Sequence, residues 1–390
     1  MPHTQPMNFI IAPDSFKGSL SASHAARSIA AGVRAVYPDA QVLLVPLADG
    51  GEGTVEALVT ATQGRFVQCP VTGPLGSPVT AIFGFSGLDP QTAILEMASA
   101  SGITLIPQSE RNPLRASTFG TGEMLLAALE AGARKIIIGI GGSATNDGGA
   151  GAMQALGVRF LDKHGEPLPK PIGGADLIHV AKIDMSAITF PVDQIPIIIA
   201  SDVNNPLVGP NGASAVYGPQ KGAKPDMVKQ LEEALTHYAR IVEDTLGISI
   251  ADLPGSGAAG GLGGGLTAFL HAEMASGIDL VLDAAHFDDA VANADWVITG
   301  EGRIDSQTLQ GKTISGVMKR TRKHSKARVI AFGGSVDENA RQSLQDQGLY
   351  AAIAVSPPEM SVEEAMASAS RLLTESVAGT MKRIGENSLQ

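Results

Sequence analysis

Short apolar runs of β-branched residues recur along the chain, and each is followed by a polar or glycine-rich loop and then by a helical pattern. The first run, "NFIIAP", predicts a strand that ends at Pro13, and a serine-capped helix is expected over about residues 21–36. The next run predicts a strand over 42–47 and a helix from Thr54. Apolar strands that alternate with helices are typical of a parallel sheet covered on both faces.

The same unit returns three times near the C-terminus, in "DWVITGEGRIDSQT", "ARVIAFGGSVDENARQSLQDQG" and "YAAIAVSPPEMSVEEAMASASRLLTESV". The middle of the chain follows another pattern. There "QCPVTGPLGSPVTAIFGF" and "TAILEMASASG" read as hairpin-like strands bracketed by proline and glycine. Two further strands, "VRFLD" and "IPIIIASD", precede a long helix over about residues 225–246.

We therefore expect an α/β fold with two α/β domains. Residues 1–72 and 292–390 are predicted to form a discontinuous domain with a Rossmann- or flavodoxin-like parallel sheet and helices on both faces. A larger mixed α/β domain, residues 73–291, is inserted into it. Open parallel sheets bind ligands at the loops that follow their strands, here "PDSFKG", "ADGGEG", "TGEGRID" and "FGGSVD". The active site is expected in the cleft between the two domains.

Composition narrows the class of protein. The 390 residues have a hydrophobic content of 44% and a mean hydropathy of +0.13, as in folded soluble proteins. No apolar run approaches the ~18–20 residues of a membrane helix, and no secretory signal is visible, so we expect a cytoplasmic protein. The single cysteine, Cys69, fits that reducing compartment. A net charge of −11 argues against nucleic acid as a partner, because the phosphate backbone is bound by positively charged surfaces.

One glycine loop, "GIGGSATNDGGAGAMQALG", permits three interpretations. Gly139, Gly141 and Ala144 satisfy the dinucleotide pattern G-x-G-x-x-A, and Asp162 lies roughly 20 residues further on. However, Thr145 to Asp147 delay the helix that this pattern requires, and the acidic Asp147 would repel a pyrophosphate unless a cation intervened. A role in binding phosphate or metal-phosphate is favoured, while a dinucleotide role and plain packing stay open.

Two other segments resemble ligand loops without matching a motif fully. "SQTLQGKT" places Lys312 as in a P-loop, but Ser306 stands where the first glycine belongs and the strand ends too early. "PGSGAAGGLGGGLTAF", residues 254–269, permits close approach of backbone to a ligand or forms a hinge. Neither segment decides the function alone.

Charged residues gather in the loops after the predicted strands. Asp14, Ser15 and Lys17 follow the first strand, where a lysine favours anion contact. Acidic residues with no cysteine and no paired histidines suit Mg²⁺ held with phosphate rather than zinc. The predicted metal ligands are Asp49, Glu52 and Asp202.

Together these segments resemble the bacterial glycerate kinase family. The resemblance rests on "APDSFKGSLSA", "PLADGGEGT", "GTGEMLLAALEAG", "GIGGSATNDGGAGAMQALG", "PGSGAAGGLGGGL" and "TGEGRIDSQTLQGKTISGV", which run in order over nearly the whole chain. It implies two α/β domains, ATP with Mg²⁺ as cofactors, and D-glycerate as acceptor. Members most like this chain are expected to make 2-phosphoglycerate in glyoxylate, glucarate or galactarate breakdown.

Chemistry then predicts a role for each candidate residue. Lys17 and Lys312 would neutralise the transferred phosphoryl group, and Asp305 would act as the base. Arg303, with Asp14 and Ser15, would bind glycerate. Backbone groups of two glycine-rich segments would line the nucleotide: Gly141, Gly142, Ser143 and Asn146 in the first, and Gly257, Gly260, Gly261, Gly263 and Gly264 in the second.

Three alternatives stay open at this point. An NAD-dependent 2-hydroxy-acid dehydrogenase is the first, on the evidence of "GIGGSA" and Asp162. The cleft also suits a non-catalytic sensor of carboxylates or phosphates. Both hydroxyls of glycerate fit the same groups, so a 3-phosphoglycerate product is the third alternative. A monomer and a homodimer are both compatible with the sequence.

Overall fold

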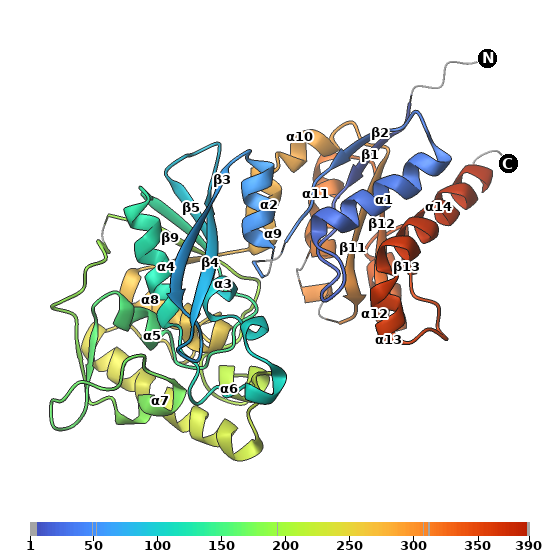
Figure 1. Cartoon of the computed structure of the whole chain (residues 1–390). Helices are drawn as coiled ribbons and strands as arrows, with labels where there is room; N and C mark the ends of the chain where they lie inside the picture. Colours follow the sequence, from blue (N-terminus) through green and yellow to red (C-terminus); the bar gives the residue numbers. More distant parts are fainter. Residues whose placement is uncertain are drawn as a thin grey trace. The chain divides into compact units, whose positions relative to one another are not determined.

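The computed structural model of the chain describes residues 6–48, 50–51, 53–192, 194–306, 308–310 and 313–387. The chain divides into two compact units (Figure 1). The first consists of two separate stretches, from residues 1–49 and 278–390, and the second is the continuous stretch 50–277. Each unit has a sheet of its own, so the predicted α/β fold with two α/β domains is confirmed.

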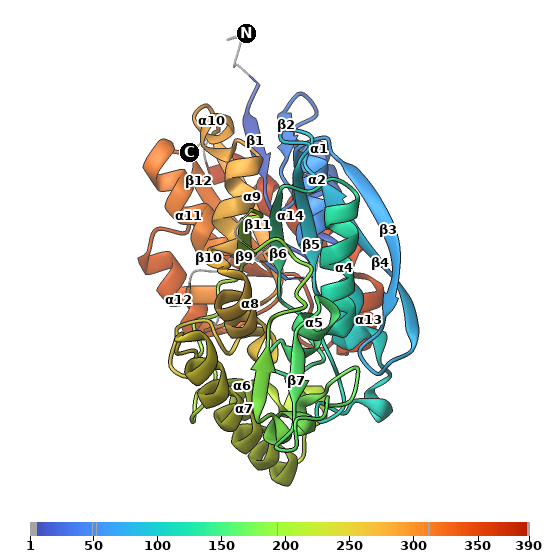
Figure 2. The ribbon, with the colours of Figure 1, turned by 90° about the vertical axis from the view of Figure 1, so that its left-hand side faces the viewer.

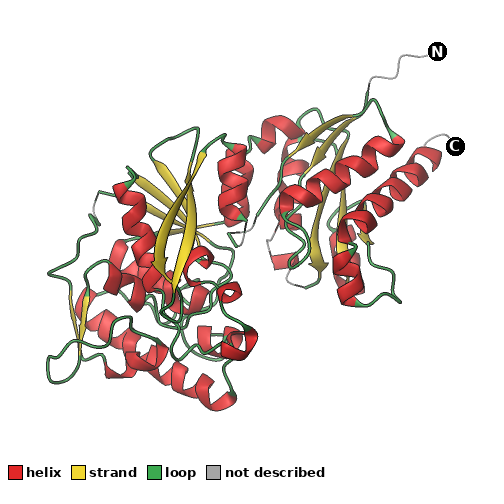
Figure 3. Cartoon of the chain, in the orientation of Figure 1, coloured by secondary structure: helices red, strands yellow, loops and turns green. Residues whose placement is uncertain are grey.

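The first unit contains a fully parallel sheet in the order β13-β12-β11-β1-β2 (Figure 3). Its strands are β1 (Asn8–Ile11), β2 (Gln41–Leu44), β11 (Trp296–Ile304), β12 (Arg328–Val336) and β13 (Ala351–Ala354). Neighbouring side chains of one strand point to opposite faces. Because Ile10 and Ile11 are both buried, as are Val297 and Ile298, helices must cover both faces of this sheet.

Two long helices pack together on one of these faces, α1 (Ala22–Val36) and α14 (Ala369–Asn387) (Figure 1). The Ser28 hydroxyl lies 2.9 Å from that of Ser370, and the Thr374 hydroxyl donates to the Ser28 carbonyl. The serine cap predicted for α1 is present, since Ser21 accepts a hydrogen bond from the backbone of His24. The remaining helices of this unit are α9 (Gly277–Ala284), α10 (Phe287–Val291), η6 (Thr308–Gln310), α11 (Thr313–His324), α12 (Glu338–Asp346) and α13 (Val362–Ala367).

The second unit contains a mixed sheet in the order β10-β9-β6-β5-β4-β3 (Figure 2). The hairpin of β3 (Arg65–Thr72) and β4 (Pro78–Phe85) is antiparallel, and so is the pairing of β4 with β5 (Thr92–Glu96). The parallel part comprises β5, β6 (Lys135–Gly139), β9 (Ile197–Ala200) and β10 (Glu273–Ala275). The predicted strand "VRFLD" lies outside this sheet, because β7 (Arg159–Leu161) pairs only with β8 (Lys182–Asp184).

Helices complete the second unit around a large apolar core. The predicted long helix is α7 (Pro225–Leu246), which begins with a proline and ends at Gly247 in the left-handed region. The other α-helices are α2 (Thr54–Ala61), α3 (Ala98–Ser101), α4 (Phe119–Glu130), α5 (Ala150–Ala155), α6 (Ala213–Tyr217) and α8 (Leu262–Leu270). Short 3₁₀ turns are η1 (Ile103–Leu105), η2 (Gln108–Glu110), η3 (Gly174–His179), η4 (Pro219–Lys221) and η5 (Ala258–Gly261). No helix of the described residues is both long and apolar enough to cross a bilayer.

The boundaries of the units differ from the predicted 72/73 and 291/292. Residues 50–72 belong to the second unit because β3 pairs with β4 along its whole length. Helix α2 is joined to the same sheet, since the backbone N–H of Val55 donates to a carboxylate oxygen of Glu96 at 2.6 Å. Residues 278–291, which form most of α9 and all of α10, belong instead to the first unit.

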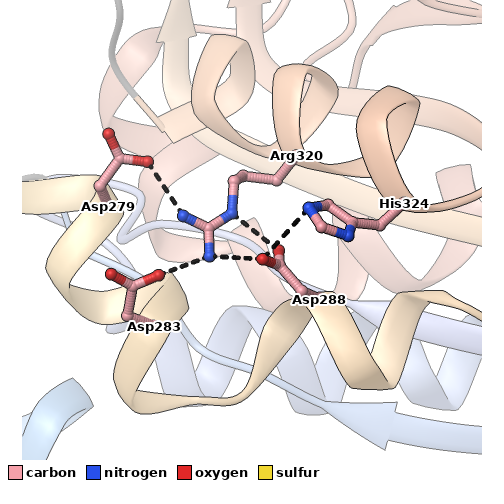
Figure 4. A network of polar contacts seen from close by, with 5 residues as sticks. All are labelled: Asp279, Asp283, Asp288, Arg320 and His324. Atoms are coloured by element: carbon pink, nitrogen blue, oxygen red, sulfur yellow. Dashed lines mark hydrogen bonds and ion pairs between the residues drawn. The ribbon is translucent and has the colours of Figure 1, made fainter.

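An arginine surrounded by carboxylates holds α9, α10 and α11 together in the first unit (Figure 4). Arg320 on α11 lies 2.7 Å from Asp288, 2.5 Å from Asp283 and 3.5 Å from Asp279. His324 extends the network to the second oxygen of Asp288 at 3.3 Å. Because the Arg320 side chain is only 16% exposed, these ion pairs fix the position of α9 and α10 in a way that hydrophobic pattern alone does not reveal.

Candidate active site

A cavity of about 690 Å³ lies in the first unit at the carboxyl ends of β1, β11, β12 and β13. This is the edge at which open parallel sheets bind their ligands. Three of the four predicted ligand loops border it, "PDSFKG", "TGEGRID" and "FGGSVD". In the fourth, "ADGGEG", the predicted ligands Asp49 and Glu52 lie outside the described residues.

The cavity brings together five residues that the sequence predicted for the site: Asp14, Ser15, Lys17, Arg303 and Asp305. Their convergence supports the prediction that these loops act together. Lys312, the other predicted catalytic lysine, lies outside the described residues.

Asp14 is held firmly at the end of β1. Its carboxylate accepts hydrogen bonds from the hydroxyl of Thr313 at 2.8 Å and from the backbone N–H of Ser15 at 2.5 Å. Its own N–H donates to the carbonyl of Gly300 in β11 at 2.8 Å. Although the residue is only 5% exposed, it borders the cavity, so Asp14 offers a fixed negative group to a ligand there.

A buried threonine positions two further acids. The Thr308 hydroxyl donates to a carboxylate oxygen of Glu301 at 2.5 Å and accepts from the backbone N–H of Asp305 at 3.1 Å. A second hydrogen bond, from the N–H of Thr308 to the carbonyl of Asp305, closes this turn. Arg303 lies 3.3 Å from the Asp305 carboxylate and is 74% exposed. Glu301, Arg303 and Asp305 therefore border one wall of the cavity.

Lys17 reaches the same wall from the loop after β1. Its side chain is exposed and borders the cavity. A Cβ on Gly302 would lie 3.2 Å from the backbone nitrogen of Lys17 and 3.4 Å from the Cα of Phe16. The glycine therefore lets the lysine loop approach β11 closely, and places a cation beside the acidic turn.

Sequence reasoning missed part of this cavity. The contributions of Thr308 and Thr313 are invisible in the sequence, because each depends on a hydrogen bond to another segment. The apolar wall, from residues 354–372, was also missed, although "AVSPPEMSVEEAM" follows a predicted strand as the other loops do. The residues of this segment that line the cavity carry no charged side chain, so nothing in them pointed to a ligand site.

The glycine loop of the second unit is folded against the protein rather than open. Gly141 donates its N–H to the carbonyl of Gly50, and Gly142 accepts from Ile103. Ser143, which is 8% exposed, forms an isolated bridge with Gly102. Asn146 is completely buried and donates to the hydroxyl of Ser214 at 3.1 Å.

Asp147 in this loop serves as a buried anchor. Its carboxylate accepts four hydrogen bonds, from the N–H and hydroxyl of Thr118 and from the N–H groups of Gly149 and Gly151. Burial raises the pKa of Asp147, and these hydrogen bonds act in the opposite direction. The carboxylate thereby joins the start of α4 to the start of α5, so Asp147 has a structural role.

Lys221 is buried beside this anchor. Its ammonium group donates to the carbonyl of Thr145 at 2.6 Å, and the residue is 2% exposed. Burial lowers the pKa of Lys221 to about 7, while the Asp147 carboxylate opposes that shift. Tyr238 is also completely buried, and burial together with Asp147 raises its pKa.

The second glycine-rich segment packs directly on the first. A Cβ on Gly260 would lie 2.0 Å from the Thr145 carbonyl, and one on Gly261 would lie 2.6 Å from the Cα of Gly148. Gly257, Gly263 and Gly264 face the backbone or side chains of Pro206, Gly255 and Ser256. Packing therefore accounts for glycine at these positions, and the predicted nucleotide role of the two segments stays a prediction.

The loop does not follow the dinucleotide pattern in three dimensions. Helix α5 begins at Ala150, well after β6 ends at Gly139. Asp162, which would contact a ribose, instead closes the β7–β8 region by accepting from the N–H groups of His164 and Glu166. These positions remove the structural basis of the dehydrogenase alternative.

The third predicted metal ligand, Asp202, follows β9 in the second unit. Among the described residues, no group of three or more histidine, cysteine, aspartate or glutamate side chains is arranged to hold a metal ion. The predicted set therefore depends on Asp49 and Glu52, which the structure does not describe.

Comparisons with known proteins identify the family. The model of the glycerate kinase family matches residues 9–385. A glycerate kinase of Halalkalibacterium halodurans is 50% identical over 366 residues, which cover 94% of this chain and 95% of that protein. An Escherichia coli K12 protein named glycerate 2-kinase is 50% identical over 333 residues, or 85% and 86% of the two chains.

A solved structure agrees with these matches. The crystal structure of a Salmonella typhimurium LT2 protein, assigned as glycerate kinase 2, has a TM-score of 0.83 and 46% identity, and covers 99% of this chain and 100% of that chain. The resemblance seen in the motifs is thus confirmed over nearly the full length. The chain belongs to the glycerate kinase family and is a kinase, that is, a phosphotransferase.

Proposed function

We propose that this chain transfers the γ-phosphoryl group of ATP to the 2-hydroxyl of D-glycerate, which gives 2-phospho-D-glycerate and ADP. Membership of a kinase family implies ATP as the donor. The choice of the 2-position rests on the similarity to the Escherichia coli protein named glycerate 2-kinase, 50% identical over 85% of this chain.

The cavity of the first unit supplies groups for this reaction. Arg303 would pair with the carboxylate of glycerate, with Asp14 and Ser15 contacting its hydroxyls. Asp305 would take the proton of the 2-hydroxyl as that oxygen forms its bond to the γ-phosphorus and the bond to ADP breaks. Lys17 would balance the negative charge that spreads over the transferred group.

Mg²⁺ is part of the proposal. The charge of a metal bound with the phosphates would neutralise the phosphoryl oxygens during transfer. Asp49, Glu52 and Asp202 are the proposed ligands from the sequence. Asp14 and Glu301, two of the acids that border the cavity, have the hard oxygen atoms that Mg²⁺ prefers, so this wall suits a metal-nucleotide.

Coupling the reaction to enolase tests both the activity and the position. With enolase present and phosphoglycerate mutase absent, 2-phosphoglycerate is converted to phosphoenolpyruvate directly, whereas 3-phosphoglycerate is not. We expect phosphoenolpyruvate to form at the rate at which ATP is consumed. Glycerate-dependent consumption of ATP without phosphoenolpyruvate would show phosphorylation at the 3-position, and no glycerate-dependent consumption would refute the proposal.

The role of Asp305 has its own test. Asp305→Asn should lower kcat with little change in the affinity for ATP, because the amide cannot take the proton. If the variant changes only the KM for ATP, Asp305 belongs with the metal or nucleotide ligands instead of acting as the base.

A further inference from the structure

One wall of the cavity is apolar and has no use in binding glycerate. It is lined by Val355, Pro357, Pro358, Met360, Val362 and Met366, which lie between the end of β13 and helix α13. Val362 is 75% exposed and Met366 is 38% exposed. Large apolar side chains with this exposure beside a cavity are characteristic of ligand sites.

The apolar wall is held in place by its own local structure. Ser361 caps α13 by accepting a hydrogen bond from the N–H of Glu364, and the Glu364 carboxylate accepts from Ser361 in return. This capping box fixes the start of the helix and thus the direction of the Val362 side chain. The two prolines before it restrict the backbone of the adjoining loop.

Glycerate and ATP differ in what they offer to this wall. Each carbon of glycerate carries an oxygen, so glycerate has no apolar face to bury. Adenine has two flat faces that gain free energy when they leave water against apolar side chains. A volume of about 690 Å³ falls in the range of sites for ligands much larger than glycerate.

The apolar wall continues directly into the cationic part of the cavity. A Cβ on Gly18 would lie 2.6 Å from the terminal methyl of Met366, and Gly18 is adjacent to Lys17 in the chain. Gly18 has φ +80°, a conformation that favours glycine, so the loop can turn there against Met366. A ligand that covers Met366 therefore extends towards Lys17 without leaving the first unit.

We propose that this wall is the subsite for the adenosine part of ATP, with the phosphate chain directed towards Lys17. The inference rests on the proposed function for the identity of the nucleotide. It moves the expected nucleotide site away from the two glycine-rich segments of the second unit, whose glycines make room for neighbouring protein atoms.

Photolabelling with 2-azido-ATP tests the location without any need for glycerate. Trypsin releases the proposed wall within one peptide, residues 342–371, whereas the glycine-rich segments leave in the peptides 136–159 and 241–303. We expect the peptide 342–371 to be labelled, and we expect excess ATP to suppress this labelling. Sequencing of the labelled peptide locates the label within 241–303, because that peptide also carries Glu301 and Arg303 of the cavity. ATP-suppressible label in 136–159 or in the glycine-rich residues 254–269 instead, or no label that ATP suppresses, would overturn the assignment.

Kinetics of two polar variants give a second test on the full-length protein. Val362→Asn and Met366→Gln should each raise the KM for ATP about three- to ten-fold, because apolar contact with the base is lost. The inhibition constant of inorganic triphosphate, which has no base, should change less than about two-fold. An equal change for both ligands, or no change for ATP, would contradict a base subsite.

A matched control separates this effect from general damage. Leu88 is 62% exposed on the second unit and is not among the residues that line the cavity. Leu88→Asn should leave the KM for ATP unchanged. If the wild-type protein is labelled in 342–371 yet does not phosphorylate glycerate, the subsite stands and the proposed function fails. If it phosphorylates glycerate but is labelled elsewhere, the proposed function stands and the subsite fails.

Discussion

Thr313, at the start of α11, donates its hydroxyl hydrogen to the Asp14 carboxylate at 2.8 Å, although 299 positions separate the two residues. Thr313 is fully buried and Asp14 nearly so. Backbone pairing of β1 with β11 brings the Asp14 loop to the carboxyl edge of the sheet, where α11 begins soon after β11. The hydrogen bond thus fixes a carboxylate at the cavity through a residue that does not line it.

Thr313→Val should lower kcat/KM for glycerate about ten-fold, which corresponds to the net worth of one hydrogen bond to a charged group. The valine keeps the shape of the side chain but leaves the Asp14 carboxylate without this donor. The enolase-coupled assay measures the change. Thr374→Val is the control, since that hydroxyl donates to Ser28 and Ser370 elsewhere in the first unit. Unaltered kinetics for Thr313→Val would show that Asp14 does not depend on this hydroxyl.

Lys17→Ala should lower kcat by about 10²–10³, the cost of losing a charge contact to the transition state. The side chain is exposed, so its loss should leave the fold intact. Lys382→Ala provides the comparison, because Lys382 is an exposed lysine of the same unit that does not line the cavity. Wild-type kcat in a folded Lys17→Ala protein would remove Lys17 from the mechanism.

Asp147→Asn should destabilise the protein by about 2–4 kcal/mol. The amide nitrogen of asparagine would face N–H and O–H groups that donate to the Asp147 carboxylate in the wild-type protein. Thr118→Val removes one of these donors and also leaves the N–H of Ala152 without its acceptor. Since the two changes break a shared contact, their effects in the double variant should differ from a simple sum by at least about 1 kcal/mol. Urea unfolding followed by circular dichroism measures all three variants, and strict additivity would contradict the network.

Local sequence patterns were sufficient for the parallel sheet and for most of the cavity. Apolar runs located β1, β11, β12 and β13, and the rule that ligands meet the carboxyl ends of parallel strands then brought Asp14, Lys17 and Asp305 to one site. The unit boundaries could not be obtained in this way. The hairpin pattern of β3 does not say which sheet it extends, and the ion pairs of Arg320 join segments more than 30 residues apart.

The glycine-rich segments and Lys221 show why the rest was not predictable. A glycine in a sequence signals that space is limited, but not whether a ligand or another backbone takes that space. Gly260 lies against the carbonyl of Thr145, and the ammonium group of Lys221 donates to the same carbonyl from the interior. Both facts depend on contacts across the fold.

Two helical glycines provide a direct test of the packing interpretation. Gly265 in α8 would place a Cβ 2.5 Å from the Gly148 carbonyl oxygen, whereas Gly379 in α14 has no heavy atom within 4 Å of that position. Gly379→Ala should stabilise the protein by roughly 0.5–1 kcal/mol through helix propensity. Gly265→Ala should lower the free energy of unfolding by at least about 2 kcal/mol, although alanine brings the same gain in helix propensity there. Thermal unfolding of both variants checks this, and a stabilised Gly265→Ala protein would show that α8 can move away from Gly148.

The buried ammonium of Lys221 should make stability depend on pH in a defined direction. Its pKa is about 7 in the folded protein and has an ordinary value of 10.5, so between these values the unfolded chain binds a proton that the folded chain lacks. Raising the pH across this range therefore favours the folded state, by at most about 1.4 kcal/mol per pH unit. Below pH 7 both states are protonated and the dependence ends.

Lys221→Met isolates this contribution, because the variant keeps Asp147 and Tyr238, the other titratable groups of the same buried cluster. The free energy of unfolding of the wild-type protein, relative to that of the variant, should increase from about pH 7 to about pH 9.5, within the range between the two pKa values. Urea unfolding at several pH values measures the difference. Parallel pH profiles would mean that Lys221 is protonated in both the folded and the unfolded state. The Thr145 carbonyl and Asp147 would then stabilise its buried charge.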